Sequence, residues 1–440
     1  MCSFIGTNRE VVETDLEKAN QFTKNRGPDK TSVSGHEGIT FVHNLLSITG
    51  DFKEQPLWST DGSTMCLFNG EIYNYSSFGD YQTDGDCLIP LYETMGEAFV
   101  EKLDGEYAIV IIDFLKDRIV FATDPFATKP LWWCIEGAEF AFASYESAIK
   151  NLGFSTATKV PPNKVVCRKL SDMTVITSRE VFKFDIKQHK QHYEDWCDAF
   201  ISSLSKRVGG LREKAFIGLS GGYDSGAIAA GLDHLDLPYR AYTIPGAENV
   251  EILAQRHGVV PDMHILNISP EQFYFEKDFL RQECEDFHFN GKPAARTDKA
   301  SAGLSLICRT ARTEGYKVYL SGQGADEIIS DYGFNGRGFY THSQFGGRFP
   351  EDLTRIFPWR SFYGGTQEKY LGKEECVAGS HGIETRYPFL DKALVQEFLW
   401  LDSSLKNRFY KAPLHHFLSK YDFPFSVNEK VGFRPNHKFK

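Results

Sequence analysis

Short apolar runs separated by polar turn residues occupy roughly the first 180 positions of the chain. Five such runs stand at 38–48, 64–74, 106–114, 118–123 and 139–144. Gly, Asp and Asn residues lie between them, which is typical of an antiparallel sheet. Helical patterns cover about 10–24 and 86–103, so we expect sheets with helices on their outer faces.

The pattern changes after a polar stretch at 183–195, which has little periodicity and is a candidate linker. AFIGLS (215–220) and YKVYLS (316–321) each predict a buried strand that runs into a Gly-rich turn and then a helix. Repeated strand–loop–helix units indicate a parallel α/β sheet whose ligand crevice lies at the carboxyl ends of the strands. We therefore predict two domains, 1–185 of α+β type and 190–440 of α/β type.

The composition is that of an ordinary globular protein, with 440 residues, 41% of them hydrophobic and 25% charged. The formal net charge of −10 argues against a general nucleic-acid binder, which needs a basic surface. Nine cysteines without a C-x-x-C pair argue against a disulfide framework or a zinc ribbon and favour the cytoplasm. The longest apolar run, 107–112, is too short to cross a membrane. We expect a cytoplasmic protein without nucleic-acid or membrane partners.

The turn LSGGYDSG (219–226) carries the strongest chemical signal. A strand ends at Leu219, a tight turn follows, and Asp224 and Ser225 open a helix. Backbone N–H groups of such a turn, together with the helix N-terminus, form a cradle for pyrophosphate. No Gly-Lys-Ser/Thr follows, so this is not a Walker sequence. A plain strand-to-helix turn is the structural alternative.

A second turn, LSGQGADEI (320–328), follows the other predicted strand. Parallel strands would bring Asp224 and Asp326 to one crevice, where two carboxylates are suited to hold Mg²⁺ beside nucleotide phosphates. Taken alone, this turn is also compatible with a surface loop that carries solvated acids. The Gly-, Phe-, Tyr- and Arg-rich stretch 332–367 is expected to be a substrate-covering loop or an irregular surface segment rather than a nucleic-acid stacking surface.

Three features near the N-terminus are open to structural and to chemical interpretations. NRGPD (25–29) fits a rigid proline turn, and FNGEIYN (68–74) contains the Asn-Gly pair favoured in hairpins. Cys2 directly follows the initiator methionine, whose removal would give it a free α-amine. That amine titrates at roughly 7.7–8.0 and can act as the base for the thiol. The Asn69 side chain and the Gly70 N–H can then supply an oxyanion hole.

In their order along the chain, these motifs are similar to those of two known domains. The glutaminase domain of class II amidotransferases resembles the first half through Cys2, RGPD (26–29), NGEIYN (69–74), DGD (84–86), DPFATKPL (124–131) and FAS (142–144). The ATP-pyrophosphatase synthetase domain resembles the second half through LSGGYDS (219–225), SGQGADE (321–327), GIETRYPFLD (382–391) and YKAPL (410–414). Nearly the whole chain thus resembles the glutamine-hydrolysing asparagine synthetase family, which also includes β-lactam synthetases.

For the first domain, the resemblance implies an Ntn-type α-β-β-α sandwich with a glutaminase site. Cys2 would be the nucleophile that forms a γ-glutamyl thioester and releases ammonia. Asn69 and Gly70 would stabilise the oxyanion, while Glu71 and Asp86 would hold the α-amino group of glutamine.

For the second domain, the resemblance implies a parallel-sheet ATP-pyrophosphatase fold, like that of the adenine nucleotide α-hydrolases. The residues expected to bind ATP are Leu219, Ser220, Gly221, Gly222, Asp224, Ser225, Ile244, Ser321 and Gly322. Asp224 and Asp326 would bind magnesium. Glu384 and Lys411 would lie near the reacting centre, where the lysine neutralises charge as pyrophosphate leaves. Ammonia would travel an internal tunnel to a carboxyl group activated as its adenylate.

Three departures from the family pattern concern the substrates. Leu45 stands where the glutaminase family usually has an arginine that clamps the α-carboxylate of glutamine, and leucine cannot donate a bidentate pair. Gln323 replaces the glutamate of asparagine synthetases and the tyrosine of β-lactam synthetases. The synthetase half is also shorter than in asparagine synthetases and carries the unusual insert at 332–367. The acceptor therefore need not be aspartate.

We predict a glutamine-dependent ligase that adenylates a small carboxylate with ATP and Mg²⁺, giving AMP and pyrophosphate, and amidates it. A homodimer is compatible with this prediction. The alternative is a β-lactam-synthetase-like reaction, in which an amine other than glutamine-derived ammonia captures the acyl adenylate. Cys2 disfavours that alternative, whereas Leu45 and Gln323 keep it open. A non-catalytic binding relative is disfavoured by the intact carboxylates Asp224 and Asp326.

Overall fold

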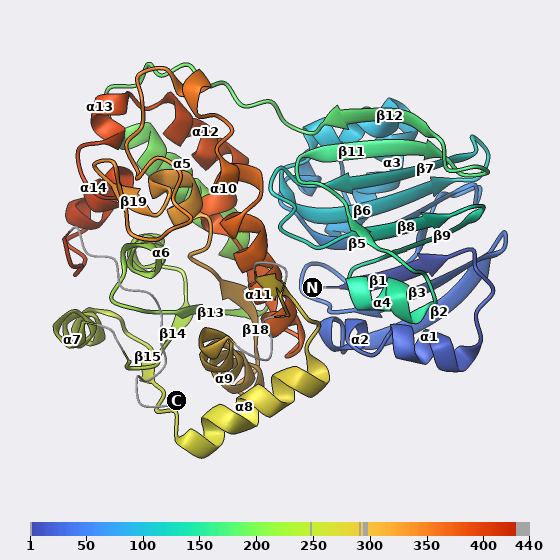
Figure 1. Ribbon diagram of the computed structural model, residues 1–440, viewed down its shortest axis with the longest axis horizontal. Helices are drawn as coiled ribbons and strands as arrows, with labels where there is room; N and C mark the ends of the chain where they lie inside the picture. The colour runs from blue at the N-terminus through green and yellow to red at the C-terminus, as the bar shows by residue number, and fades with distance from the viewer. Residues whose placement is uncertain (1, 247–248, 290–291, 294–297, 428–440) are drawn as a thin grey trace. The chain divides into compact units, whose positions relative to one another are not determined.

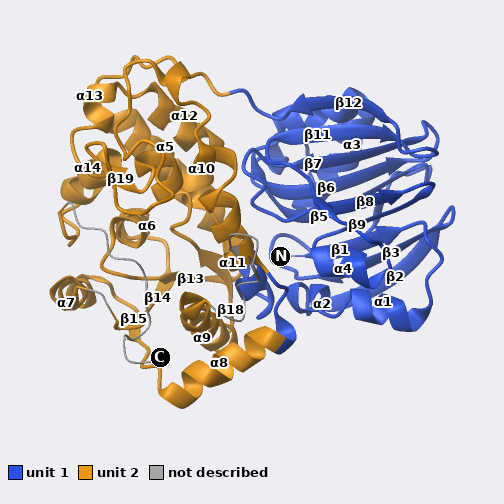
Figure 2. Cartoon of the chain, in the orientation of Figure 1, with its two compact units in different colours: residues 1–183, 282–286, 375–384 blue, residues 184–281, 287–374, 385–440 orange. Residues whose placement is uncertain are grey.

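A computed structural model describes residues 2–246, 249–289, 292–293 and 298–427, and the chain divides into two compact units (Figure 2). The first unit comprises residues 1–183, 282–286 and 375–384, and the second comprises 184–281, 287–374 and 385–440. The second half of the sequence thus contributes two short segments to the first unit. No local pattern of hydrophobic and polar residues indicated that contribution.

The first unit contains two six-stranded antiparallel sheets (Figure 1). One sheet has the order β10 (Thr158–Lys159), β8 (Trp132–Glu136), β9 (Glu139–Ala143), β1 (Ser3–Thr7), β3 (Ile39–Leu45) and β2 (Lys30–His36). The other has the order β12 (Val175–Glu180), β11 (Lys164–Lys169), β7 (Arg118–Thr123), β6 (Gly105–Asp113), β5 (Thr64–Ile72) and β4 (Leu57–Trp58).

Alternating side chains of these strands build three apolar layers. Phe4 of β1 and Leu67 of β5 pack in the core between the sheets. The next residue on β1, Ile5, turns outward to a core shared with α4, and Phe68 of β5 turns outward to a core shared with α3. Helices α1 (Glu13–Ala19), α2 (Thr23–Arg26) and α4 (Glu146–Asn151) lie on one sheet and α3 (Leu88–Met95) lies on the other, with 3₁₀ turns η1 (Tyr75–Ser77), η2 (Asp84–Cys87) and η3 (Gly96–Lys102). The predicted α-β-β-α sandwich is confirmed.

The second unit is built on a five-stranded sheet, which confirms the predicted α/β domain. Its order is β15 (Met263–Ile265), β14 (Tyr239–Thr243), β13 (Lys214–Gly218), β18 (Tyr316–Leu320) and β21 (Glu384–Arg386). The first four strands of this order pair in parallel. Because β13 and β18 are parallel neighbours, the two Gly-rich turns that follow them lie at the same edge of the sheet.

Helices and short elements surround this sheet in the second unit. The helices are α5 (Glu194–Val208), α6 (Tyr223–His234), α7 (Val250–Val259), α8 (Pro270–Glu283), α9 (Lys299–Thr313), α10 (Arg360–Tyr363), α11 (Thr366–Gly379), α12 (Lys392–Trp400), α13 (Ser403–Lys406) and α14 (Ala412–Lys420). The short elements are β16 (His288–Phe289), β17 (Lys292–Pro293), β19 (Gly333–Phe334), β20 (Arg337–Gly338), a π-helical turn η4 (Asp326–Ser330), η5 (Leu353–Arg355) and η6 (Pro388–Leu390). Among the described residues, no helix combines the length and the apolar content needed to cross a membrane.

The Asn-Gly pair of FNGEIYN does not form a hairpin, so that structural interpretation is wrong. Asn69 and Gly70 lie inside β5 and pair with Ala108 and Tyr107 of β6. Gly70 has a φ of +139°, and a Cβ there would lie 1.9 Å from the carbonyl oxygen of Glu106. Only glycine fits this combination of positive φ and close backbone approach.

Candidate active sites

Cys2 lies directly before β1 and lines a cleft of the first unit together with Leu45, Lys53, Gly70 and Glu71. Its thiol is half-buried, and the Sγ atom is 3.9 Å from the carbonyl oxygen of Leu46. Burial raises the pKa of the Cys2 thiol to about 11, and nearby carboxylates act in the same direction. The thiol therefore needs a base in order to act as a nucleophile near neutral pH.

Asn69 is fully buried one residue before the cleft-lining Gly70. Neither its Nδ2 nor its Oδ1 has a hydrogen-bond partner within the described part of the chain. An unpaired buried amide is costly, since burial removes its hydrogen bonds to water. A buried amide without a hydrogen-bond partner needs an explanation in a native structure. One explanation is that its N–H group is available to donate to a reaction intermediate.

His43 is a second buried polar residue of this kind, and none of the sequence motifs indicated it. It lies on β3 opposite Phe4 of β1, and both of its ring nitrogens lack a partner among the residues that the structure describes. Burial lowers the pKa of His43 to about 3, so its imidazole is neutral. Only its position two residues before Leu45 could have drawn attention to it.

The two acids expected to hold the α-amino group of glutamine are placed differently. Glu71 lines the Cys2 cleft and accepts hydrogen bonds from the Thr49 hydroxyl at 3.0 and 2.8 Å, one on each carboxylate oxygen. Asp86 lines an adjoining hollow, where it forms an ion pair with Lys53 and accepts a hydrogen bond from the backbone N–H of Thr83. Lys53 lines both spaces.

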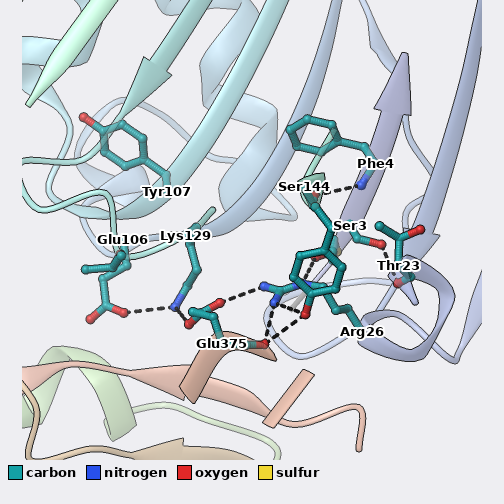
Figure 3. A network of polar contacts seen from close by, with 12 residues as sticks. Ser3, Phe4, Thr23, Arg26, Glu106, Tyr107, Lys129, Ser144 and Glu375 are labelled. Atoms are coloured by element: carbon teal, nitrogen blue, oxygen red, sulfur yellow. Dashed lines mark hydrogen bonds and ion pairs between the residues drawn. The ribbon is translucent and has the colours of Figure 1, made fainter. Parts of the chain in front are cut away.

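Two buried cations of the first unit are paired with carboxylates outside the cleft (Figure 3). Arg26 of the RGPD motif donates to the Glu375 carboxylate at 2.8 Å and to the Tyr145 hydroxyl at 2.8 Å. Lys129 of the DPFATKPL motif lies 3.3 Å from carboxylate oxygens of both Glu106 and Glu375. All four charged side chains are at most 2% exposed. The buried ion pairs of Arg26 and Lys129 thus indicate a structural role for these two motif residues.

The second unit contains a crevice of about 400 Å³ at the edge where β13 and β18 end. Eight of the nine residues predicted to bind ATP line it: Leu219, Ser220, Gly222, Asp224, Ser225, Ile244, Ser321 and Gly322. Gly221 belongs to the same turn, but it is buried and does not line the crevice. A Cβ on Gly322 would come within 3.0 Å of the Asp224 Cβ, so the two Gly-rich turns touch.

The first Gly-rich turn is braced by its own serines and by an arginine that the sequence did not reveal. The Ser220 N–H donates to the Ser225 hydroxyl at 3.1 Å, and the Gly222 N–H donates to the Ser220 hydroxyl at 3.1 Å. Arg256, fully buried on α7, donates to the carbonyl oxygens of Ser220 and Gly222. Its guanidinium thereby fixes the carbonyl side of a turn whose opposite side faces the crevice.

Asp224 and Asp326 line the same crevice, as the parallel topology predicted, and their carboxylates share one ammonium group. Lys411 Nζ lies 2.6 Å from Asp224 Oδ1 and 2.7 Å from Asp326 Oδ1, and the Tyr410 hydroxyl donates to Asp326 at 3.1 Å. Lys411 is buried and has a left-handed backbone with φ +48°, which is unusual for a residue with a Cβ. Such strain is typical of functional positions.

This carboxylate pair suits a magnesium ion in its chemistry. Mg²⁺ prefers hard oxygen ligands and is commonly held by one or two carboxylates, with phosphates and water completing its coordination. Within the described ranges, no group of three or more His, Cys, Asp or Glu side chains could hold a metal by itself. Asp224 and Asp326 therefore fit a metal that arrives with a nucleotide.

Two family models match successive parts of the chain. A glutamine amidotransferase domain matches residues 1–190, and an asparagine synthase domain matches residues 212–371. The chain thus combines a glutamine amidotransferase domain with an asparagine synthase domain. The predicted class of enzyme, a carbon–nitrogen ligase with glutamine as nitrogen donor, is confirmed by these matches and by similarity to named asparagine synthetases.

Several asparagine synthetases are similar to this chain over most of its length. A putative glutamine-hydrolyzing asparagine synthetase 1 of Methanocaldococcus jannaschii is 29% identical, over 84% of this chain and 72% of the relative. Asparagine synthetase 2 of Arabidopsis thaliana is 25% identical, over 91% of this chain and 70% of the relative. Among solved structures, the allosteric regulatory enzyme of purine biosynthesis is similar with a TM-score of 0.35 and 14% identity, over 61% of this chain and 81% of that one.

Glu384 and Lys411, both predicted near the reacting centre of the synthetase domain, line different spaces. Lys411 lines the crevice of the second unit. Glu384 lines the Cys2 cleft, where its carboxylate contributes to the raised pKa of the thiol, and it does not line the crevice. The structure thus groups Glu384 with the residues predicted to form the glutaminase site.

The insert at 332–367 is not a purely surface segment. Tyr332 is buried, and both Tyr332 and Tyr340 line the crevice with the predicted ATP-binding residues. Gln323 also lines it and donates from Nε2 to Glu374 at 3.3 Å. Gln323 and two residues of the insert therefore line the crevice, whereas Leu45 lines the Cys2 cleft.

Proposed function

We propose that Cys2 hydrolyses glutamine and that the ammonia amidates a carboxylate that the second unit has activated as its adenylate. The observation that carries the proposal is that both half-sites are present on one chain. The first is a cysteine cleft beside the unpaired amide of Asn69, and the second is a crevice in which Asp224 and Asp326 share one ammonium.

The glutaminase half requires a base, an oxyanion hole and a binding site for the amino acid. With the initiator methionine removed, the α-amine of Cys2 would take the thiol proton, and the thiolate would attack the amide carbon of glutamine. The Asn69 amide and the Gly70 N–H would stabilise the oxyanion as ammonia leaves. Glu71 and Asp86 supply negative charge for the α-ammonium group.

The synthetase half would bind ATP in the crevice, with Asp224 and Asp326 as carboxylate ligands of Mg²⁺. The ion would supply charge stabilisation on the phosphates. Lys411 would release the two carboxylates as the polyanion enters and would then neutralise charge on the departing pyrophosphate. A carboxylate acceptor would lie against the insert residues Tyr332 and Tyr340, so these residues would select it.

The β-lactam-synthetase-like alternative keeps the adenylation but uses another amine. It is supported by the apolar Leu45 in the Cys2 cleft and by the un-ionisable Gln323 in the crevice. A lack of glutaminase activity in the purified protein would favour this alternative over the proposal.

Two experiments test the proposal. Cys2→Ala is expected to abolish glutamine-dependent amidation while ammonia-supported amidation persists, because the crevice is unchanged; loss of both together would contradict it. Incubation of the protein with Mg²⁺-ATP, amide-¹⁵N-glutamine and a metabolite extract would identify the acceptor by mass spectrometry.

All nine cysteines are free thiols, which is consistent with a cytoplasmic enzyme. Light scattering would test for a homodimer.

A further inference from the structure

The lining of the Cys2 cleft is strongly unbalanced in charge. Its charged side chains include four carboxylates, on Asp51, Glu71, Asp84 and Glu384. Among the described residues that line it, Lys53 is the one cation. Glutamine enters as a zwitterion, so a site that recognises it must offer one positive partner as well as negative ones.

Other cations of the first unit are poorly placed for this task. Arg26 and Lys129 are buried in ion pairs with Glu375 and do not line the cleft (Figure 3). Lys30 is the direct cross-strand partner of Leu45, but its side chain is about half exposed and its Nζ lies 4.0 Å from Glu54. Lys30 does not line the cleft either.

The segment that carries Lys53 is fixed at both ends against β5. On one side, Thr49 donates to the Glu71 carboxylate. On the other, Gln55 Nε2 donates to the Phe68 carbonyl at 3.1 Å, and Gln55 Oε1 accepts from the Phe68 N–H at 2.7 Å. These contacts hold the backbone near Lys53, while its side chain remains 49% exposed and free to change rotamer.

The partner of Lys53 is Asp86, the acid expected to bind the α-ammonium of glutamine. We propose that Lys53 binds the α-carboxylate of glutamine. When glutamine binds, the Lys53–Asp86 ion pair separates. The α-ammonium of glutamine then pairs with Asp86, and its α-carboxylate pairs with Lys53. Each protein charge exchanges one partner for another, so no charge is left unpaired. This assignment rests on the proposed glutaminase function of Cys2.

The test measures glutamate release by the full chain from glutamine and from glutaminamide, whose α-carboxylate is replaced by a neutral amide. Lys53→Met is expected to raise KM for glutamine by about 10- to 100-fold, the range of a hydrogen bond to a charged group. It should also remove most of the preference for glutamine over glutaminamide. That preference is a ratio of two rates of the same sample and is therefore independent of the fraction that is folded.

A matched control and a rescue complete the experiment. Lys30→Met is expected to keep the wild-type KM and preference. Leu45 lines the same cleft, so Leu45→Arg in the Lys53→Met background should restore the preference by supplying a guanidinium. An unchanged preference in Lys53→Met, or its loss in Lys30→Met, would overturn the assignment. If the wild-type chain itself releases no glutamate, the proposed function fails instead.

Discussion

Asn69 beside the Cys2 cleft and Asp326 in the crevice of the second unit are both buried polar residues, yet their surroundings differ. The Asn69 amide has no hydrogen-bond partner in the described residues. Asp326 accepts from the Tyr410 hydroxyl and lies 2.7 Å from the Lys411 ammonium, which it shares with Asp224. The first site keeps an amide dipole without a partner, whereas the second pairs its two carboxylates with one ammonium group.

This difference follows from the charge that each site is proposed to meet. An oxyanion forms only during the reaction, so a preorganised amide that has no ground-state partner can stabilise it without first breaking a bond. A nucleotide arrives already charged, and two neighbouring carboxylates without a counter-ion would repel it and each other. Lys411 keeps Asp224 and Asp326 close together until other partners replace it.

The largest effect is expected from removing one of the two carboxylates that share the Lys411 ammonium in the crevice. Asp326→Asn should lower ATP–pyrophosphate exchange by about 10³-fold or more, because it removes one of two carboxylates suited to Mg²⁺. Glutamate release from glutamine should continue. The same substitution at Asp278, an exposed acid paired with Arg281, should leave the exchange unchanged. Equal exchange rates for the two variants would refute the role of Asp326.

The next effect tests the unpaired amide against a paired one. Asn69→Ala should lower kcat for glutamate release by about 10²- to 10³-fold, the usual cost of losing an oxyanion donor, with little change in thermal stability. Asn44 is equally buried but exchanges hydrogen bonds with Ser3, Asn20 and Thr31. Asn44→Ala should therefore destabilise the chain by about 2–4 kcal/mol. If Asn69→Ala loses stability rather than turnover, its amide is structural.

The smallest effect concerns a charge cluster that serves the fold. Asp391 of the GIETRYPFLD motif is buried against Arg207 at 2.9 Å and also pairs with Lys206. Burial opposes ionisation, but these two cations hold the pKa of Asp391 at about 2. The carboxylate therefore stabilises the fold fully above pH ~4, and this contribution is lost as the pH falls toward 2.

Asp391→Asn isolates that charge, because asparagine can still cap α12 as Asp391 does through the N–H groups of Ala393 and Leu394. The midpoint of urea unfolding at pH 7 should fall by the equivalent of about 2 kcal/mol, the free energy that corresponds to the lowered pKa of this carboxyl group. The decline of stability between pH 4 and 2 should become shallower than in the wild type. The same change at Asp352, an exposed cap, should alter neither quantity. An unaltered acid decline in Asp391→Asn would show that the pair adds no stability.

Local sequence was sufficient where one segment determines its own conformation. The runs 64–74, 106–114 and 118–123 became β5, β6 and β7 because alternating side chains pack on both faces of each strand. The structure has two helices, α1 and α2, in place of the one helix predicted over 10–24. The first ends just before Asn20, whose side chain donates a hydrogen bond to Asn44 of the distant strand β3. That interruption depends on a tertiary contact.

Local sequence patterns were sufficient to predict the two fold classes, the two Gly-rich turns and their meeting at one crevice, because hydrophobic periodicity and turn residues act within single segments. Which buried groups have a hydrogen-bond or ion-pair partner could be read from the folded structure alone. Arg256 braces a turn 34 residues away, Glu384 joins Cys2 rather than Lys411, and Lys53 faces Asp86. Pairing of buried charges and amides depends on distances between remote segments, and a one-dimensional pattern does not contain those distances.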